Sequence, residues 1–457
     1  MKGDLTQGPI IKTMLRFAVP MILGNLLQQC YNIADTLIVG KYLGPNALAA
    51  VGSAFTLMTF LTSILLGLCM GSGAVFSIRF GEKDYEGLKE GMFASFILIS
   101  ALTVVLNGLA FIFIDEILLF LQVPEDVVGM MKDYLMVIFV GISATFIYNY
   151  FASLLRSIGN SIVPLVFLAV CAVMNIGLDL WFVLRLERGV AGAAEATVIS
   201  QFASAIGITI FTWAKFPQLR LQKRHCVIRL KCIKEISSFS ILTCIQQSVM
   251  NLGILMVQGL VNSFGPTVMA AFAAAVKIDA FAYMPVQDFG NAFSTFIAQN
   301  YGAKKKQRIR LGLKGAVITA LIFCVIISAT VWIFAKPFML LFVDSNEMAI
   351  VEEGIRYLHI EGAFYCGIGC LFLLYGLYRA LGKPGMSVVL TVISLGTRVA
   401  LAYVLSSIPA LGVVGIWWSV PIGWILADVV GALYYLICKK KLFSFSDPHM
   451  LADIQEV

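Results

Sequence analysis

Long hydrophobic runs alternate with short polar breaks, many containing glycine or proline, along nearly the whole chain. A membrane-spanning helix needs roughly 20 mostly apolar residues, and each of these runs is long enough to qualify. The pattern therefore predicts twelve membrane-spanning helices. Their predicted ranges are 14–39, 46–78, 88–114, 131–155, 161–185, 190–214, 236–263, 267–299, 311–335, 354–380, 386–408 and 412–438.

Composition supports a membrane protein and excludes several other classes. The 457 residues are 60% hydrophobic and 13% charged, whereas soluble domains are about 45–50% apolar and about 25% charged. The ten cysteines are scattered without a Cys-x-x-Cys pair and there are only three histidines, so neither a zinc site nor a disulfide framework is predicted. The chain lacks a Gly-x-x-x-x-Gly-Lys-Ser/Thr phosphate loop, so it is not expected to be an ATP-driven pump by itself.

The net charge of +7 comes from Lys and Arg residues clustered in alternate polar breaks. This distribution indicates membrane orientation rather than nucleic-acid binding, because basic residues concentrate in cytoplasmic loops. It predicts a multi-pass protein of the cell membrane with both termini in the cytoplasm. The polar start lacks a cleavage signal, so we expect no segment to be removed.

The longest polar break, 215–235, lies midway along the chain and is predicted to be a cytoplasmic linker. It would separate an amino-terminal lobe (1–214) from a carboxy-terminal lobe (236–440), with a cytoplasmic tail at 441–457. Short motifs recur between the lobes at an offset of 221 or 223 residues. They include Gly44-Pro45 with Gly265-Pro266, and Leu155-Arg156 with Tyr378-Arg379. Because each lobe has six spans, the expected fold is all-α, with two pseudo-symmetric lobes in parallel orientation.

At the level of motifs the chain resembles the multidrug and toxic compound extrusion (MATE) transporters. The resemblance rests on Pro20, Asn32-Ile33-Ala34-Asp35, Arg156-Ser157-Ile158-Gly159-Asn160, Asn175-Ile176-Gly177-Leu178-Asp179, Gly189-Val190-Ala191-Gly192-Ala193-Ala194 and Gln299-Asn300-Tyr301-Gly302. It implies efflux of cationic or amphipathic compounds by antiport with protons or sodium ions. It also implies two lobes that alternate in access, no cofactor besides the coupling ion, and no enzymatic activity.

Acids inside predicted spans are the main functional signal, since each costs roughly 2.5–3.5 kcal/mol at a helix centre. Asp35, Asp179 and Thr197 fall at similar depths from the outer side, and Asn175 shares a helix face with Asp179. Two adjacent carboxylates in a partly dry pocket would favour binding of a proton near physiological pH. The same oxygens would suit a hard cation such as Na⁺. By resemblance the four residues match the family's amino-lobe cation site; alternatively, the acids lie at the interface and the amide and hydroxyl pack helices.

The acidic site is not repeated in the second lobe, because the 223-residue offset places Arg398 opposite Asn175 and Ala402 opposite Asp179. Ion coupling is therefore expected in the first lobe. The remaining polar residues within spans are expected to form a charge-balanced network or part of the substrate surface. They are Gln28, Lys277, Asp279, Asp288, Glu361 and Arg398. Pro20 interrupts the first span and is the expected hinge, since proline removes a helical hydrogen bond.

Two other functions deserve comparison with drug efflux. A flippase for lipid-linked precursors, from the same superfamily, would need several cationic residues in its cleft, and the acids of the first lobe argue against it. A membrane enzyme would need a catalytic cluster, but His225, His359 and His449 are far apart and none is beside a carboxylate motif. The expected partners are therefore a small organic cation or amphipathic compound and membrane lipid, and the expected state is a monomer.

Overall fold

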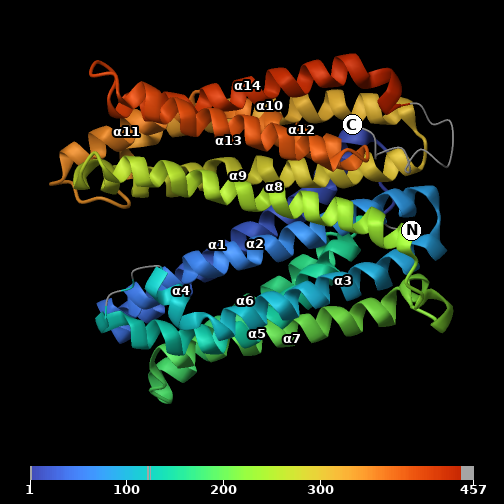
Figure 1. Cartoon of the computed structure of the whole chain (residues 1–457), viewed down its shortest axis with the longest axis horizontal. Helices are drawn as coiled ribbons and strands as arrows, with labels where there is room; N and C mark the ends of the chain where they lie inside the picture. The colour runs from blue at the N-terminus through green and yellow to red at the C-terminus, as the bar shows by residue number, and fades with distance from the viewer. Residues whose placement is uncertain (1–2, 121–122, 124, 444–457) are drawn as a thin grey trace. The chain divides into compact units, whose positions relative to one another are not determined.

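The computed structural model describes residues 3–120, 123 and 125–443, and its described regular elements are all helical (Figure 1). The α-helices are α1 (Ile10–Leu43), α2 (Pro45–Glu82), α3 (Tyr85–Ile112), α4 (Ile114–Phe120), α5 (Glu125–Ser157), α6 (Ile162–Leu180), α7 (Gly189–Lys215), α8 (Leu230–Asn262), α9 (Pro266–Gly302), α10 (Lys306–Met339), α11 (Met348–Gly362), α12 (Tyr365–Ala380), α13 (Pro384–Ser406) and α14 (Val413–Leu442). One π-helical turn, Trp181–Arg185, continues α6.

Eleven helices of the described chain are long and apolar enough to cross a membrane, and α11 with α12 provides a twelfth span. The prediction of twelve spans is therefore confirmed. The span predicted at 354–380 is formed by two helices, α11 and α12, which meet at an angle of 52°. The backbone tightens at this break: Phe364 N–H donates to Glu361 O at 2.9 Å and Gly367 N–H donates to Phe364 O at 2.8 Å.

The linker is shorter than the predicted 215–235. Helix α8 begins at Leu230, six residues before the predicted start at 236, so 216–229 connect α7 to α8. Glu235 lies in this early part of α8, and its Oε2 atom accepts a hydrogen bond from Arg79 at 2.5 Å. Charged residues thus belong to the helix here, although a hydropathy pattern assigns them to a loop.

The internal repeat appears in the backbone as well as in the sequence. Four pairs of residues with positive φ are separated by the offsets 221 or 223: Gly44 (89°) and Gly265 (95°), Lys83 (62°) and Lys304 (56°), Gly159 (84°) and Gly382 (76°), and Gly189 (61°) and Gly412 (49°). Gly44 and Gly265 each precede a proline that starts a helix, the position at which proline's fixed φ is favourable. The same turns therefore recur at equivalent places in the two halves.

Packing divides the chain into two compact units, which are described separately. Unit 1 consists of Met1–Asp4 and Val19–Cys244, and unit 2 consists of Leu5–Ala18 and Ile245–Val457. The division falls inside α1 and α8 rather than at the predicted borders 214/215 and 235/236. The start of α1 thus packs with unit 2, and the start of α8 packs with unit 1. Most of the predicted tail, from residue 444 onward, lies outside the described residues.

Glycines explain how the start of α8 joins unit 1. A Cβ atom added at Gly71 would lie 2.4 Å from the carbonyl oxygen of Phe239, and one added at Gly67 would lie 2.5 Å from Cα of Cys244. Only glycine permits so close an approach of two helix backbones, a common arrangement in membrane helices. A hydrogen bond of 2.8 Å between the hydroxyls of Ser72 and Ser240 adds to this contact.

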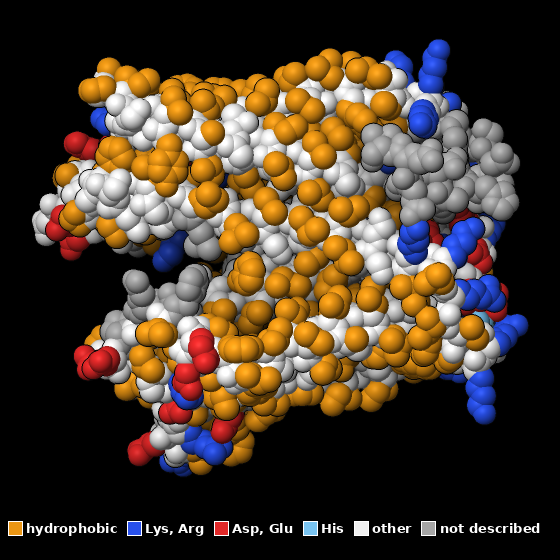
Figure 2. All heavy atoms as spheres, viewed as in Figure 1, with side chains coloured by type: hydrophobic (Ala, Val, Ile, Leu, Met, Phe, Trp, Pro, Cys, Tyr) orange, Lys and Arg blue, Asp and Glu red, His pale blue; other side chains and the backbone are white. Residues whose placement is uncertain are grey.

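Residues 5–8, at the start of unit 2, are held by α9 and α10 of the same unit. The amide of Leu5 donates to Gln299 Oε1 at 3.0 Å, and the Arg308 guanidinium donates to the carbonyl oxygens of Gln7 and Gly8, both at 2.7 Å. Within each unit, hydrophobic side chains cover the sides and Lys and Arg side chains gather at one end (Figure 2). In unit 1 this end carries the connection α2–α3, and in unit 2 it carries the connection α9–α10. Each unit therefore has the surface expected of a membrane-embedded helix bundle.

Candidate functional site

Two helices of unit 1 place the candidate amide, hydroxyl and one carboxyl group. Asn175 and Asp179 lie one turn apart on α6 and are buried, with 2% and 0% of their surface exposed. Thr197 lies on α7, which packs against α6. Asn175 Nδ2 donates a hydrogen bond to Thr197 Oγ1 at 3.1 Å. The structure therefore brings these three predicted residues together.

Asp35 on α1 completes the group, because its carboxyl group interacts directly with that of Asp179. Both oxygens of Asp179 and the Oδ1 atoms of Asp35 and Asn175 are buried and have no hydrogen-bond donor among the described residues. Two carboxylates repel each other unless a proton or a cation lies between them. These four oxygens can thus accept a positive species. The alternative placement of the two acids as interfacial side chains does not fit the full burial of Asp179.

Two tyrosines at this site were missed by sequence reasoning. Tyr134 on α5 interacts with both Asp35 and Asp179, and Tyr31 on α1 interacts with Asp35. A phenol donates one hydrogen bond, so both side chains can stabilise a charged carboxylate. The internal repeat could have drawn attention to Tyr134, because Tyr134-Leu135 recurs as Tyr357-Leu358 at the offset of 223.

A π-helical turn directly follows the candidate site. It spans Trp181–Arg185, two residues after Asp179. Single π turns inside α-helices are rare and are frequent at functional sites, because they shift the side chains that follow. No pattern in the sequence indicated this turn.

The second predicted group is only partly assembled. In unit 2, Asp279 on α9, Glu361 on α11 and Arg398 on α13 interact with one another and are buried, with 4%, 1% and 9% exposed. Asp288 is also buried, nine residues further along α9. Lys277, by contrast, is exposed and makes no ion pair with a described residue. The network therefore centres on two acids and one arginine.

Gln28 and Pro20 both lie on α1. Gln28 is exposed and lies seven residues before Asp35, which places the two on the same helix face. Pro20 lies within a continuous α1, directly after the Ala18–Val19 step at which the packing passes from unit 2 to unit 1.

No group of three or more His, Cys, Asp or Glu side chains suited to a metal ion occurs among the described residues. The candidate site in unit 1 combines two carboxylates with one amide and one hydroxyl. Oxygen-only sets of this kind suit hard cations rather than zinc or iron.

Comparison with known proteins identifies the family. The model of the MatE family matches residues 20–181 and 240–404, which is well over half of the chain. The chain belongs to the MatE family. Its members are transporters rather than enzymes, and this chain is accordingly a multi-pass membrane protein.

Relatives in the MatE family match the chain over nearly its full length. It is 28% identical to the probable multidrug resistance protein YpnP of Bacillus subtilis, over 94% of this chain and 96% of YpnP. It is 24% identical to the probable multidrug resistance protein NorM of Thermotoga maritima, over 93% and 92% of the two chains. The multidrug export protein MepA of Staphylococcus aureus is 23% identical over 95% and 96%.

Solved structures show the same fold. A MOP superfamily transporter from Pyrococcus furiosus superposes with a TM-score of 0.90 at 24% identity, covering 97% of this chain and 99% of that chain. A MATE transporter in the bent conformation superposes with a TM-score of 0.89 at 24% identity, covering 96% and 97%. The expected MATE-like fold is thus confirmed.

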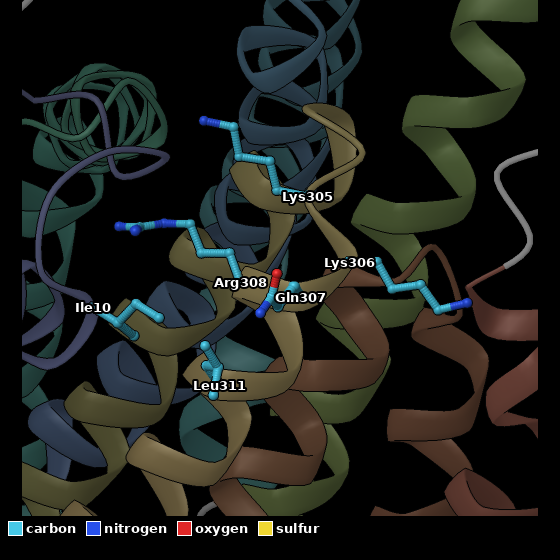
Figure 3. Close-up of a pocket in the computed structure, with 6 residues that line it drawn as sticks. All are labelled: Ile10, Lys305, Lys306, Gln307, Arg308 and Leu311. Atoms are coloured by element: carbon cyan, nitrogen blue, oxygen red, sulfur yellow. The ribbon is translucent and has the colours of Figure 1, made fainter.

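One pocket of this MatE chain lies away from the predicted residues. It has a volume of about 450 Å³ in unit 2 and is lined by Ile10, Lys305, Lys306, Gln307, Arg308 and Leu311. Lys305 and Arg308 extend to one side of it and Lys306 to the other (Figure 3). Three basic side chains would repel an organic cation, so this pocket does not suit a cationic substrate.

Proposed function

We propose that this MatE chain exports cationic or amphipathic organic compounds by antiport with protons or sodium ions, through alternating access. Asp35, Asn175, Asp179 and Thr197 are the proposed coupling site. The main observation in support is a set of four buried oxygen atoms that have no hydrogen-bond donor among the described residues. They belong to Asp35, Asn175 and Asp179. The names of the relatives, which include multidrug export and multidrug resistance proteins, support the substrate class.

The coupling step in this proposal is a change of charge at the carboxyl pair. When the pair binds a proton or Na⁺, the repulsion between Asp35 and Asp179 is removed. Release of the ion restores that repulsion and favours movement of α1, which carries Asp35. Pro20 is the proposed hinge, since it lies where α1 passes from one unit to the other.

Several further properties belong to the same proposal. The chain is proposed to act as a monomer in the cell membrane, with lipid around its apolar sides and no cofactor besides the coupling ion. Both termini are proposed to be cytoplasmic, because Lys and Arg residues concentrate in alternate polar breaks of the sequence, the linker among them.

The test is ethidium transport in proteoliposomes that contain the purified full chain. A proton gradient or a sodium gradient is imposed separately, and uptake is followed by fluorescence. Transport is expected with one of the two gradients, which identifies the coupling ion. Asp35→Asn and Asp179→Asn are each expected to lower gradient-driven transport by at least about tenfold, since a change of one factor of ten corresponds to about 1.4 kcal/mol of lost coupling.

Glu195→Gln is the matched control. Glu195 lies two residues before Thr197 on α7, but it pairs with Arg188 at 2.5 Å and does not belong to the oxygen group. This variant is expected to transport at nearly the rate of the unmodified chain. Gradient-driven transport that is equally fast in Asp35→Asn and in Glu195→Gln would refute the proposed coupling site.

A further inference from the structure

The pocket of about 450 Å³ in unit 2 combines positive charge with apolar surface. Lys305 and Arg308 extend to one side of it and Lys306 to the other, and Ile10 of α1 and Leu311 of α10 supply the apolar part (Figure 3). None of the six described residues that line it is acidic. A ligand that fits this lining carries a negative charge and an apolar portion.

The internal repeat shows that acids are replaced at the pocket positions. The positions that hold Asp84, Glu86 and Glu90 in unit 1 hold three pocket residues in unit 2, at the offset of 221: Lys305, Gln307 and Leu311. In unit 1 each of the three acids pairs with an arginine, at 3.0–3.3 Å. The chain therefore balances its own charge at this connection in unit 1, whereas the equivalent positions of unit 2 offer no carboxylate.

The segments that form the pocket are basic throughout. Residues 304–314 contain six Lys and Arg residues, and neither 5–34 nor 289–343 contains an Asp or a Glu. The positive charge at this end of unit 2 is thus not balanced by acids nearby in the sequence. An anionic ligand would lower the repulsion among the basic side chains.

Two of the basic side chains are held in position by uncharged groups. Lys305 Nζ donates to the carbonyl oxygen of Thr6 at 2.8 Å. The Arg308 guanidinium donates to the carbonyl oxygens of Gln7 and Gly8, both at 2.7 Å. These bonds fix the direction of both side chains but do not cancel their charge, because the acceptors are neutral.

An apolar track leads from the pocket along α1 and α10. The two helices approach closely, since a Cβ atom added at Gly315 would lie 3.1 Å from Cγ1 of Ile11. Leu311 and Ile318 lie about one turn before and after Gly315, on the same face of α10. Both side chains are exposed, as are those of Ile11 and Leu15 on α1. Exposed apolar side chains on membrane-spanning helices suit the acyl chains of a lipid.

We propose that this pocket binds the headgroup phosphate of one anionic phospholipid, whose acyl chains lie along the apolar faces of α1 and α10. Lys305, Lys306 and Arg308 attract the phosphate, and Ile10 and Leu311 contact the start of the acyl chains. A soluble phosphate would use only the basic side chains and leave the apolar ones in water. The proposal depends on the place of the chain in a membrane, and not on the exported compound or the coupling ion.

Native mass spectrometry of the full chain tests the site directly. The purified chain in detergent is mixed with equal amounts of two lipids with identical acyl chains. One is phosphatidylglycerol, which is anionic, and the other is phosphatidylcholine, which has no net charge. The lipids retained on the intact protein are then counted. We expect phosphatidylglycerol to fill one site before phosphatidylcholine binds.

Substitutions of exposed or half-buried pocket residues locate the site. Gln307→Glu places an acid in the pocket without changing the size of the side chain, and Lys306→Gln removes one positive charge. Each is expected to weaken phosphatidylglycerol binding about fivefold, since one charge near an anionic lipid contributes about 1 kcal/mol. Leu311→Ser is expected to weaken it about threefold through lost apolar contact.

Lys314→Gln is the matched control. Lys314 is exposed on α10 and does not line the pocket, so this variant loses the same charge as Lys306→Gln from the same helix. It is expected to bind phosphatidylglycerol as the unmodified chain does. Thermal unfolding in detergent without lipid should be the same in all four variants, which separates lipid binding from folding.

Three outcomes would overturn the proposal. The first is equal retention of phosphatidylglycerol by the unmodified chain, Gln307→Glu and Lys306→Gln. The second is equal weakening in Lys306→Gln and Lys314→Gln, which would indicate a general effect of charge. The third is displacement of phosphatidylglycerol by an excess of glycerol 3-phosphate, which would indicate a site for soluble phosphates. No drug or ion gradient is used, so failure of the transport proposal does not affect this result.

Discussion

The contact between α2 and α8 offers a test of the packing in unit 1. Gly71→Ala adds one Cβ atom, which would lie 2.4 Å from the Phe239 carbonyl oxygen, whereas ordinary contacts begin at 3.4 Å. The obstacle is backbone, so it cannot rotate away. Helix α8 must therefore move by about 1 Å relative to α2.

The cost of this movement has two parts. Overpacking in a well-packed core destabilises by about 1–3 kcal/mol. A displacement of about 1 Å also lengthens the 2.8 Å bond between Ser72 and Ser240 beyond hydrogen-bonding range, and such bonds in membranes contribute about 0.6 kcal/mol. The expected loss for Gly71→Ala is thus about 2–4 kcal/mol. Ser240→Ala, which removes only the hydrogen bond, should cost about 0.6 kcal/mol.

Unfolding can be followed by the reaction of buried cysteines with a fluorogenic thiol reagent during titration with a denaturing detergent. Cys69 and Cys232 are buried in unit 1 and become reactive when it opens. Gly52→Ala is the control on the same helix, because a Cβ atom there meets nothing within 4 Å. If Gly71→Ala unfolds at the same detergent concentration as Gly52→Ala, the close approach of α2 and α8 is refuted.

Two turns of the fold give further predictions. His225→Ala removes the 2.8 Å bond to Glu86 Oε2 and leaves the Gln222 amide without its acceptor Nδ1, a loss of about 1–2 kcal/mol that should speed trypsin cleavage of the linker about 5- to 30-fold. His225→Gln, which keeps a donor and an acceptor, should be cleaved more slowly than His225→Ala, and equal rates would contradict the assigned contacts. Lys83→Gly and Lys304→Gly should each stabilise the chain by about 1 kcal/mol, since both residues have positive φ. Alanine at these positions should not raise the thermal unfolding temperature. A rise for only one of the two glycine variants would contradict the equivalence of the two turns.

The spans and the unit 1 site could be predicted because their signals are local. A run of apolar residues long enough to cross a bilayer is visible in any window of the sequence. Asp35 and Asp179 stand out because acids are costly within such runs. Asn175 could be added because one helical turn separates it from Asp179. These inferences need only helix periodicity and depth.

Features that depend on contacts between distant helices could not be predicted. The break between α11 and α12 directly follows Glu361 and Gly362 but contains no proline, and the apolar residues on both sides still indicate one span. In the early part of α8, Glu235 pairs with Arg79, which lies 156 residues away in the sequence. Tyr134 is one of many aromatic residues within the spans, and only the fold places it beside Asp35 on α1 and Asp179 on α6.

The repeat preserves backbone turns in the two units, but it does not preserve the buried acids at equivalent positions. Turns at Gly44 and Gly265 coincide, yet the position of Asp179 holds alanine in unit 2, and that of Asp279 holds methionine in unit 1. A buried acid is tolerated only where other side chains share its proton or balance its charge. Since those neighbours come from different helices in each unit, the acids could settle at different positions while Tyr134 and Tyr357 stayed in place.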